Sequence, residues 1–179
     1  MGGTEVALSP LEVELLLISK YKKSQIDWLR NGIRIEQAAG RSIGDLLLQA
    51  CAARHSLAGH FLKSAALLLK VKPARHRDGI SRSYYSMYHA ARAVVFLANQ
   101  GDDHQEHDQL YRFLPSDFPD VDSWQNELKD ARLKRNEADY DFFPKSNLSF
   151  RTASISLFGK AKEFHAECTH YLRNRGCPL

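Results

Sequence analysis

Apolar residues recur at intervals of three and four along most of the chain, the spacing that gathers them on one face of an α-helix. The longest such run lies between residues 43 and 70 and carries Leu47, Cys51, Ala58, Phe61, Leu62, Ala65 and Leu69. No segment of the sequence alternates apolar and polar residues over the length of a strand. The pattern predicts an all-α protein.

Capping signals divide this pattern into helices. Ser9-Pro10-Leu11-Glu12 combines an N-cap serine, a proline at the first helical position and a capping-box glutamate. It predicts a first helix that stops near Asn31-Gly32. The apolar cluster from Val13 to Ile18 covers more than one face of that helix, so we expect it to pack on two surfaces or against another subunit.

Four further helices are predicted. Their expected positions are Ser42 to Lys70, Gly79 to about Asn99, Asp122 to before Pro144, and Asn147 to Tyr171, with a short piece at Leu110–Leu114. The expected fold is an up-and-down bundle of about five helices with short connections. Residues 1–40 should form an N-terminal helical extension and residues 41–175 the bundle itself.

The composition narrows the class of protein. A chain of 179 residues, 44% hydrophobic, can bury a core, and its net charge of +4 permits a polyanionic partner without requiring one. Three cysteines outside any CxxC motif predict a reducing compartment, with neither a disulfide framework nor a zinc site. The acidic N-terminal stretch and the lack of a long apolar run predict a cytoplasmic protein that does not enter a membrane.

The helix expected at Gly79–Asn99 is the most apolar and should be central to the bundle. Arg82, Tyr85 and His89 nevertheless share one of its faces, at spacings of three and four. Such groups on a central helix are costly unless they are paired or reach solvent. His89 is therefore either a satisfied core histidine or a functional group.

A second polar set lies in the sequence RNEADY, from Arg135 to Tyr140. Arg135 and Tyr140 are five residues apart, which places them about 140° apart around a regular helix. Arg135 can also form a simple i,i+4 ion pair with Asp139, in which case Tyr140 is a hydrophobic anchor. The spacing leaves both interpretations open.

Two polar connectors have weaker interpretations. His104 and His107 stand beside carboxylates, but no further ligands are spaced to complete a metal site. The basic cluster Lys70, Lys72, Arg75, His76 and Arg77 is either solvated loop charge or a contact to backbone phosphates.

Cleavage of RNA without a metal needs a base for the 2′-hydroxyl, an acid for the leaving 5′-oxygen and cations beside the phosphorus. Among the central-helix and RNEADY residues, His89 is the conventional base near neutral pH. Arg82 and Arg135 could hold the phosphate, and Asn136 and Tyr140 could orient it. The polar residues are thus compatible with a ribonuclease site that uses no metal or other cofactor.

These residues carry a resemblance to a known family. The central stretch RSYYSMYHAARAVVFLANQG resembles the R-x-YY-x-x-(F/Y)-HAA-x-A stretch of small stand-alone prokaryotic HEPN-domain proteins. His107, followed by Leu110 and Phe113, resembles their connector histidine, and Arg135–Tyr140 stands where they have an Arg-x4–6-His motif. The resemblance covers roughly residues 43–171.

The resemblance implies a helical bundle that forms a homodimer, with the Arg–His motifs of two subunits facing each other. It implies a metal-independent endoribonuclease of the toxin or antiphage type, often restrained by a nucleotidyltransferase partner. By position, Arg135 and Asn136 match the motif's arginine and its following polar residue. With the residue chemistry, we predict catalytic roles for Arg135, Asn136, Tyr140 and His89, and RNA or nucleotide binding by Arg82, Tyr85 and His107.

One departure from the family pattern keeps alternatives open, because Tyr140 stands where the motif has its last histidine. A phenol with a pKa near 10 is a poor base at neutral pH. Either His89 supplies the imidazole, or Tyr140 acts as a hydrogen-bond donor, or the chain binds RNA, a nucleotide or a partner without cutting. A helical subunit whose polar face is buried in a dimer, and a Tyr140 that accepts a nucleotidyl group, are further hypotheses.

Overall fold

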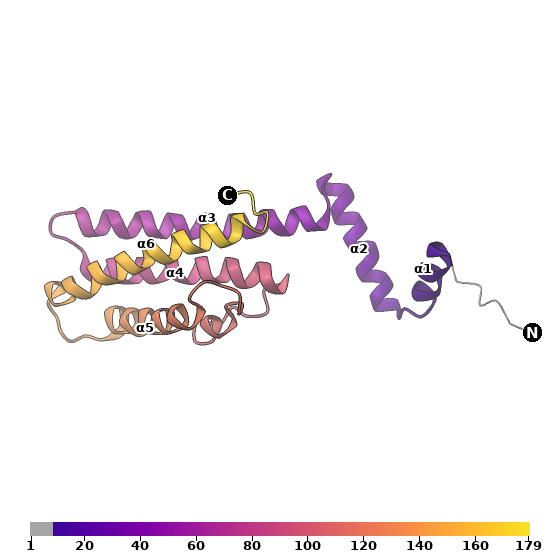
Figure 1. Ribbon diagram of the computed structural model, residues 1–179. Helices are drawn as coiled ribbons and strands as arrows, with labels where there is room; N and C mark the ends of the chain where they lie inside the picture. Colours follow the sequence, from indigo (N-terminus) through magenta and orange to yellow (C-terminus); the bar gives the residue numbers. More distant parts are fainter. Residues whose placement is uncertain (1–8) are drawn as a thin grey trace, which may run out of the picture. The chain divides into compact units, whose positions relative to one another are not determined.

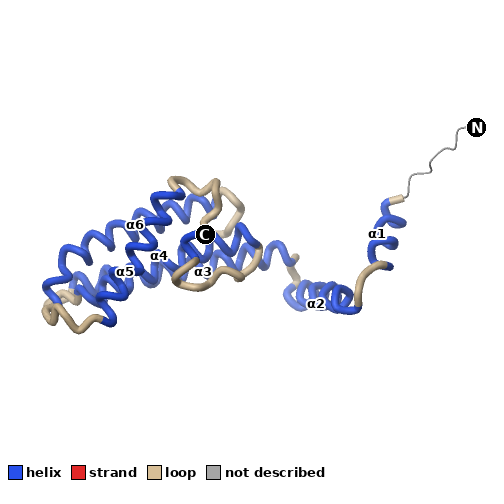
Figure 2. Tube along the Cα trace, turned by 90° about the horizontal axis from the view of Figure 1, so that it is seen from below, coloured by secondary structure: helices blue, strands red, loops and turns tan. Residues whose placement is uncertain are grey.

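A computed structural model describes residues 9–179 and confirms the all-α fold. Its elements are α1 (Pro10–Ser19), α2 (Lys23–Ala39), α3 (Ile43–Lys70), α4 (His76–Asn99), η1 (Leu110–Phe113), α5 (Val121–Tyr140), η2 (Asn147–Phe150) and α6 (Arg151–Arg173). Across the described residues the regular structure is helical throughout (Figure 2). The chain divides into two compact units between Leu46 and Leu47, within α3.

The first unit contains α1 and α2, and none of their residues is buried. The capping box at Ser9 is present: its hydroxyl accepts from the Glu12 backbone N–H, and the Glu12 carboxylate accepts from the Ser9 backbone. The large apolar side chains of α1 are exposed on several sides. A helix that is apolar all round is typical of a segment that is covered in an assembly.

The prediction of one helix from Pro10 to Asn31-Gly32 is wrong at both its middle and its end. The helix breaks after Ser19, and a new one starts where the Gln25 side chain accepts a hydrogen bond from the Lys22 backbone, 2.9 Å away. Gly32 continues that helix, because a glycine costs only about 1 kcal/mol in a helix interior. The stop signal is Gly40, whose left-handed φ of 63° a glycine adopts without strain.

The second unit is the predicted up-and-down bundle. α3, α4, α5 and α6 lie alongside one another, and the chain reverses direction at each connection (Figure 1). α4 contributes more buried residues than any other helix of the bundle and packs against α5 and α6. The central position predicted for this helix from its apolar sequence is confirmed. No helix in residues 9–179 is long and apolar enough to cross a bilayer.

Polar contacts fix the connections at one end of the bundle. Asp102, just after α4, pairs with Arg54 of α3 and Arg92 of α4. The loop before α5 is tied to the end of α6, where Asp117 accepts a hydrogen bond from Tyr171 over 2.9 Å and pairs with Arg175. These contacts tie the loops on both sides of η1 to α3, α4 and α6.

A stacked pair of histidines, buried His55 and half-buried His165, joins α3 to α6. His55 and His165 stack with ring centroids 4.3 Å apart. The Thr169 hydroxyl donates to the His165 carbonyl, so it accepts from His55 Nε2–H at 2.8 Å. That tautomer leaves His55 Nδ1 as a buried lone pair without a protein partner. A proton on this nitrogen would have no acceptor.

Acid should therefore destabilise the bundle through His55. Burial, and then the neighbouring His165, lower the pKa of His55 to about 4 from an ordinary 6.5. The unfolded chain binds this proton first, so the stability contribution is complete above pH 6.5 and is lost as the pH falls toward 4. From this residue alone we expect a loss of roughly 2 kcal/mol between pH 8 and pH 5, measured by urea unfolding.

The matched control is His60→Gln, at an exposed histidine of the same helix. His60→Gln should keep the wild-type slope of stability against pH, whereas His55→Gln should reduce it by the contribution of this one residue. A His55→Gln variant with the full wild-type slope would contradict this account.

Candidate functional site

The predicted polar residues of α4 and α5 are in direct contact. Arg135 of α5 donates from Nη2 to the Tyr85 hydroxyl of α4 over 2.7 Å, and its guanidinium carbon lies 5.4 Å from the centre of the Tyr85 ring. These two residues are fifty positions apart in the chain. The register of the two helices therefore places a cation and a phenol at one point of the bundle surface.

The remaining groups of the RNEADY segment surround the same guanidinium. Arg135 Nε lies 2.8 Å from the Asp139 carboxylate, and Nη1 donates to the Asn136 side-chain oxygen over 3.1 Å. The guanidinium carbon also lies 4.9 Å from the centre of the Tyr140 ring. The helix runs without a break to Tyr140, its last residue. The expected ion pair with Asp139 is present and Arg135 also reaches Tyr140, but the expectation of Tyr140 as a hydrophobic anchor is wrong, because that ring is 66% exposed.

His107 lies on the other side of Tyr85. Its ring centroid is 6.0 Å from that of Tyr85, edge to face, and it stacks on Tyr88 at 3.9 Å. Its Nδ1 is 2.7 Å from the Tyr84 hydroxyl. When Nδ1–H donates to Tyr84, Nε2 carries the lone pair and is free to take a proton. His107 is exposed at its edge away from Tyr88, so a substrate can reach it.

His89 and Arg82 complete the cluster through Phe61 of α3. The His89 ring stacks parallel to Phe61 at 5.1 Å and lies 6.4 Å from Tyr85. The Arg82 guanidinium lies 5.6 Å from the Phe61 ring centre and is otherwise exposed. Every predicted site residue is thus linked, through Tyr85, Phe61 or Arg135, into one set of contacts, which we call the Arg135 cluster.

The two imidazoles of the cluster differ in their surroundings. Burial, followed by the Arg92 charge, lowers the pKa of His89 to about 4. Partial burial, and then the positive charge of Arg135, lower the pKa of His107 as well. Both rings are therefore neutral at pH 7. His107 is the better placed of the two to act on a substrate, because it is exposed and His89 is covered by Phe61.

A pocket of about 480 Å³ adjoins the cluster and shares Asp139 with it. Arg75 and Arg77 of the basic segment line this pocket. His76 is buried instead, and its Nδ1–H donates to Ser154 over 2.9 Å. The solvated-charge interpretation of this segment is therefore wrong for His76, whereas exposed Arg75 keeps it.

Sequence reasoning missed two residues of the cluster, Tyr84 and Tyr88. Their spacing assigned them to the core, and their rings are indeed buried. Their hydroxyls reach out to the connector, where Tyr84 meets His107 and Tyr88 donates to the Gln105 carbonyl over 2.6 Å. The available signal was chemical, since a buried tyrosine hydroxyl needs a partner. Within residues 9–179, no three His, Cys, Asp or Glu side chains are grouped to hold a metal.

The HEPN domain model matches residues 53–170, which span the bundle and the whole Arg135 cluster. A UPF0332 protein of Pyrococcus horikoshii is 44% identical over 57 residues, which are 32% of this chain and 37% of that protein. The matched segment thus spans little more than a third of that relative. No solved structure matches the chain.

The family match agrees with the helical bundle. HEPN domains have nucleotide- or RNA-related roles in general, and they commonly act as dimers. Because the matched region covers more than half of the sequence, this chain belongs to the HEPN domain family.

Proposed function

We propose that this protein is a metal-independent endoribonuclease of the toxin or antiphage type, and that the Arg135 cluster is its site. The observation that carries the proposal is that Tyr85 contacts both other groups: its hydroxyl accepts from the Arg135 guanidinium, and its ring lies edge to face with the His107 imidazole at 6.0 Å. Arg135 supplies a cation and His107 a base, two of the groups that cleavage at a phosphodiester requires, and Tyr85 positions the cation.

In the proposed reaction, His107 Nε2 takes the proton of the ribose 2′-hydroxyl, and the 2′-oxygen attacks the neighbouring phosphorus. The bond from phosphorus to the 5′-oxygen breaks, which leaves a 2′,3′-cyclic phosphate on one product. The 5′-oxygen takes a proton from a general acid or from water and leaves as a hydroxyl. Arg135 stabilises the charge that builds on the phosphate, and Tyr85 holds the guanidinium in place.

A homodimer would complete this site, and we propose that the protein forms one. Two copies with their Arg135 clusters facing each other would double the cations at the phosphate. Arg82 and His89, near the same surface, would line the space between the copies. The exposed Tyr140 would be accessible to a nucleotidyltransferase antitoxin, the partner that the family resemblance implies.

A catalytically inactive HEPN module is the second candidate, favoured by the tyrosine at position 140. Such a module would bind RNA, a nucleotide or a nucleotidyltransferase-type partner through the same residues. The two candidates differ in whether a product forms, which the next experiment decides.

Purified protein should cleave RNA in the presence of EDTA and generate new 2′,3′-cyclic phosphate ends. Arg135→Ala should lower the rate by roughly 10²- to 10³-fold, the usual effect of removing one transition-state donor. Arg151→Ala, at an exposed arginine outside the cluster, should cleave like the wild type. Cleavage is followed on a labelled oligoribonucleotide by gel and mass spectrometry. RNA binding by the wild type without any cleavage would favour the inactive module.

The pH profile should identify His107 as the base. A base works in its neutral form, so the rate is retained down to a pH below 6.5 and falls as the pH drops through the lowered pKa of His107. His107→Asn, which keeps a partner for the Tyr84 hydroxyl, should lose about 10²-fold or more. His89→Asn should lose less than tenfold. The reverse order of the two variants would assign the base to His89, the residue favoured by the sequence.

Sedimentation equilibrium at micromolar concentration should give twice the mass of the 20.3 kDa chain. If cleavage needs two facing clusters, the specific activity should fall on dilution in parallel with the dimer fraction. A monomer with undiminished activity per chain would show that one cluster suffices.

A further inference from the structure

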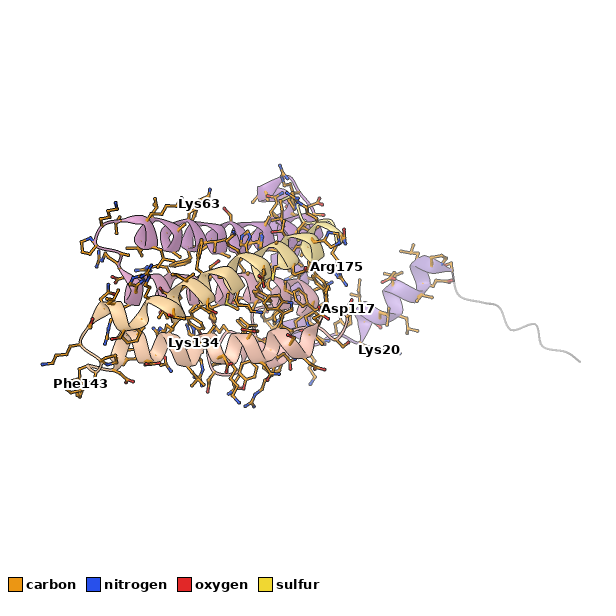
Figure 3. All side chains as sticks on the ribbon, turned by 60° about the vertical axis from the view of Figure 1, so that its left-hand side comes forward. Lys20, Lys63, Asp117, Lys134, Phe143 and Arg175 are labelled. Carbon is orange, nitrogen blue, oxygen red and sulfur yellow. The ribbon has the colours of Figure 1, made fainter. Side chains whose placement is uncertain are left out.

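Tyr140 of the Arg135 cluster is the first of three exposed aromatic side chains. Tyr140 ends α5, and Phe142 and Phe143 follow it; their exposed fractions are 66%, 80% and 65%. Figure 3 shows Phe143 projecting outward from the end of the bundle. Large aromatic rings grouped at such exposure on one surface are typical of a binding site.

Arg77 fixes the backbone that carries these three rings. Its guanidinium donates to the carbonyls of Ala138, Asp141 and Pro144 over 2.9, 2.8 and 2.7 Å. It also lies 4.4 Å from the centre of the Phe150 ring. One partly buried cation therefore ties the last turn of α5 to the loop on both sides of Phe142 and Phe143, which gives the rings a fixed base.

Cations are interleaved with the rings. Arg135 lies against Tyr140, and the Lys145 ammonium is 5.6 Å from the centre of the Phe143 ring. The nearby carboxylates are Asp139, which Arg135 neutralises at 2.8 Å, and the exposed Asp141. Aromatic faces beside cations are what single-stranded nucleic acids require, because bases stack on the rings while lysine and arginine meet the phosphates. A dry protein interface would instead exclude the charges from its centre.

We propose that Tyr140, Phe142 and Phe143 form a stacking platform for the bases of unpaired nucleotides next to the phosphate held by Arg135. The substrate class is then single-stranded or looped RNA, since the faces of paired bases are hidden inside a duplex. The inference rests on the proposed function, because the platform is useful only if the cluster binds a phosphodiester. The platform adds to that function the class of RNA that binds. It also adds Phe142 and Phe143, which take no part in the cleavage chemistry.

The test compares two oligomers that differ only in their bases. The probes are a short 2′-O-methyl oligouridylate and an abasic oligomer with the same 2′-O-methyl backbone, neither of which has the attacking 2′-hydroxyl. Fluorescence anisotropy measures their affinities for the full chain and for its variants at one fixed salt concentration. The variants are Phe142→Ala, Phe143→Ala, their double variant and Arg135→Ala. Leu67→Ala, 65% exposed on α3, is the matched control.

We expect the wild type to bind the oligouridylate at least tenfold more tightly than the abasic chain. Each phenylalanine variant should lose roughly five- to tenfold or more of the oligouridylate affinity, and the double variant should approach the abasic value. None of the phenylalanine variants should change abasic binding, whereas Arg135→Ala should weaken both oligomers. Leu67→Ala should match the wild type.

Three results would overturn the platform. If Arg135→Ala weakens both oligomers but the phenylalanine variants bind like the wild type, the platform is wrong and the proposed RNA site survives. If neither oligomer binds the wild type, the proposed function fails and the platform fails with it. If the double variant binds both oligomers normally but sediments at a lower mass, the rings belong to an interface between protein chains.

Discussion

The hydrogen bond from Arg135 to the Tyr85 hydroxyl is the contact on which the site depends. It joins α4, the buried helix of the bundle, to α5, whose sequence is far more polar. Because the guanidinium also meets Asp139, Asn136 and Tyr140, it is held from several directions at once. A group fixed in this way can meet a phosphate without first being ordered, which is how preorganised cations contribute to catalysis. The stability of the bundle core and the geometry of the site are therefore linked through one side chain.

Burial divides the histidines of the bundle into two kinds. His55 and His165 are stacked between α3 and α6, where a charge would be costly, and they act as packing residues. His107 rests on Tyr88 but remains open to solvent, and its second ring nitrogen is free. Burial lowers the pKa of all three imidazoles. The His55–His165 pair is packed between helices, whereas His107 can still reach a substrate. The arginines divide in a similar way, since the donors of Arg77 are spent on backbone carbonyls, whereas the Arg82 guanidinium lies by the Phe61 ring and is exposed.

Local signals in the sequence predicted the elements well where one residue decides the outcome. The capping box at Ser9 and the apolar face of the central helix are examples. The break between α1 and α2 was missed, because it depends on a side-chain cap from Gln25 that competes with simple helix continuation. The residues of the cluster could be named from the sequence, but spacing could not predict that His89 is half-buried and His107 exposed. Which imidazole is covered depends on Phe61, which is distant in sequence and adjacent only after folding.

The central claim is that Arg135 and His107 contact the same stretch of RNA. The most direct measurement is an NMR titration of the full chain with a 2′-O-methyl oligonucleotide, which follows the Arg135 Nε–H signal and the histidine ring signals together. We expect the Arg135 and His107 signals to shift along one binding curve while the signals of the buried His55 ring stay unchanged. Binding that shifts signals elsewhere and leaves both Arg135 and His107 unmoved would contradict it.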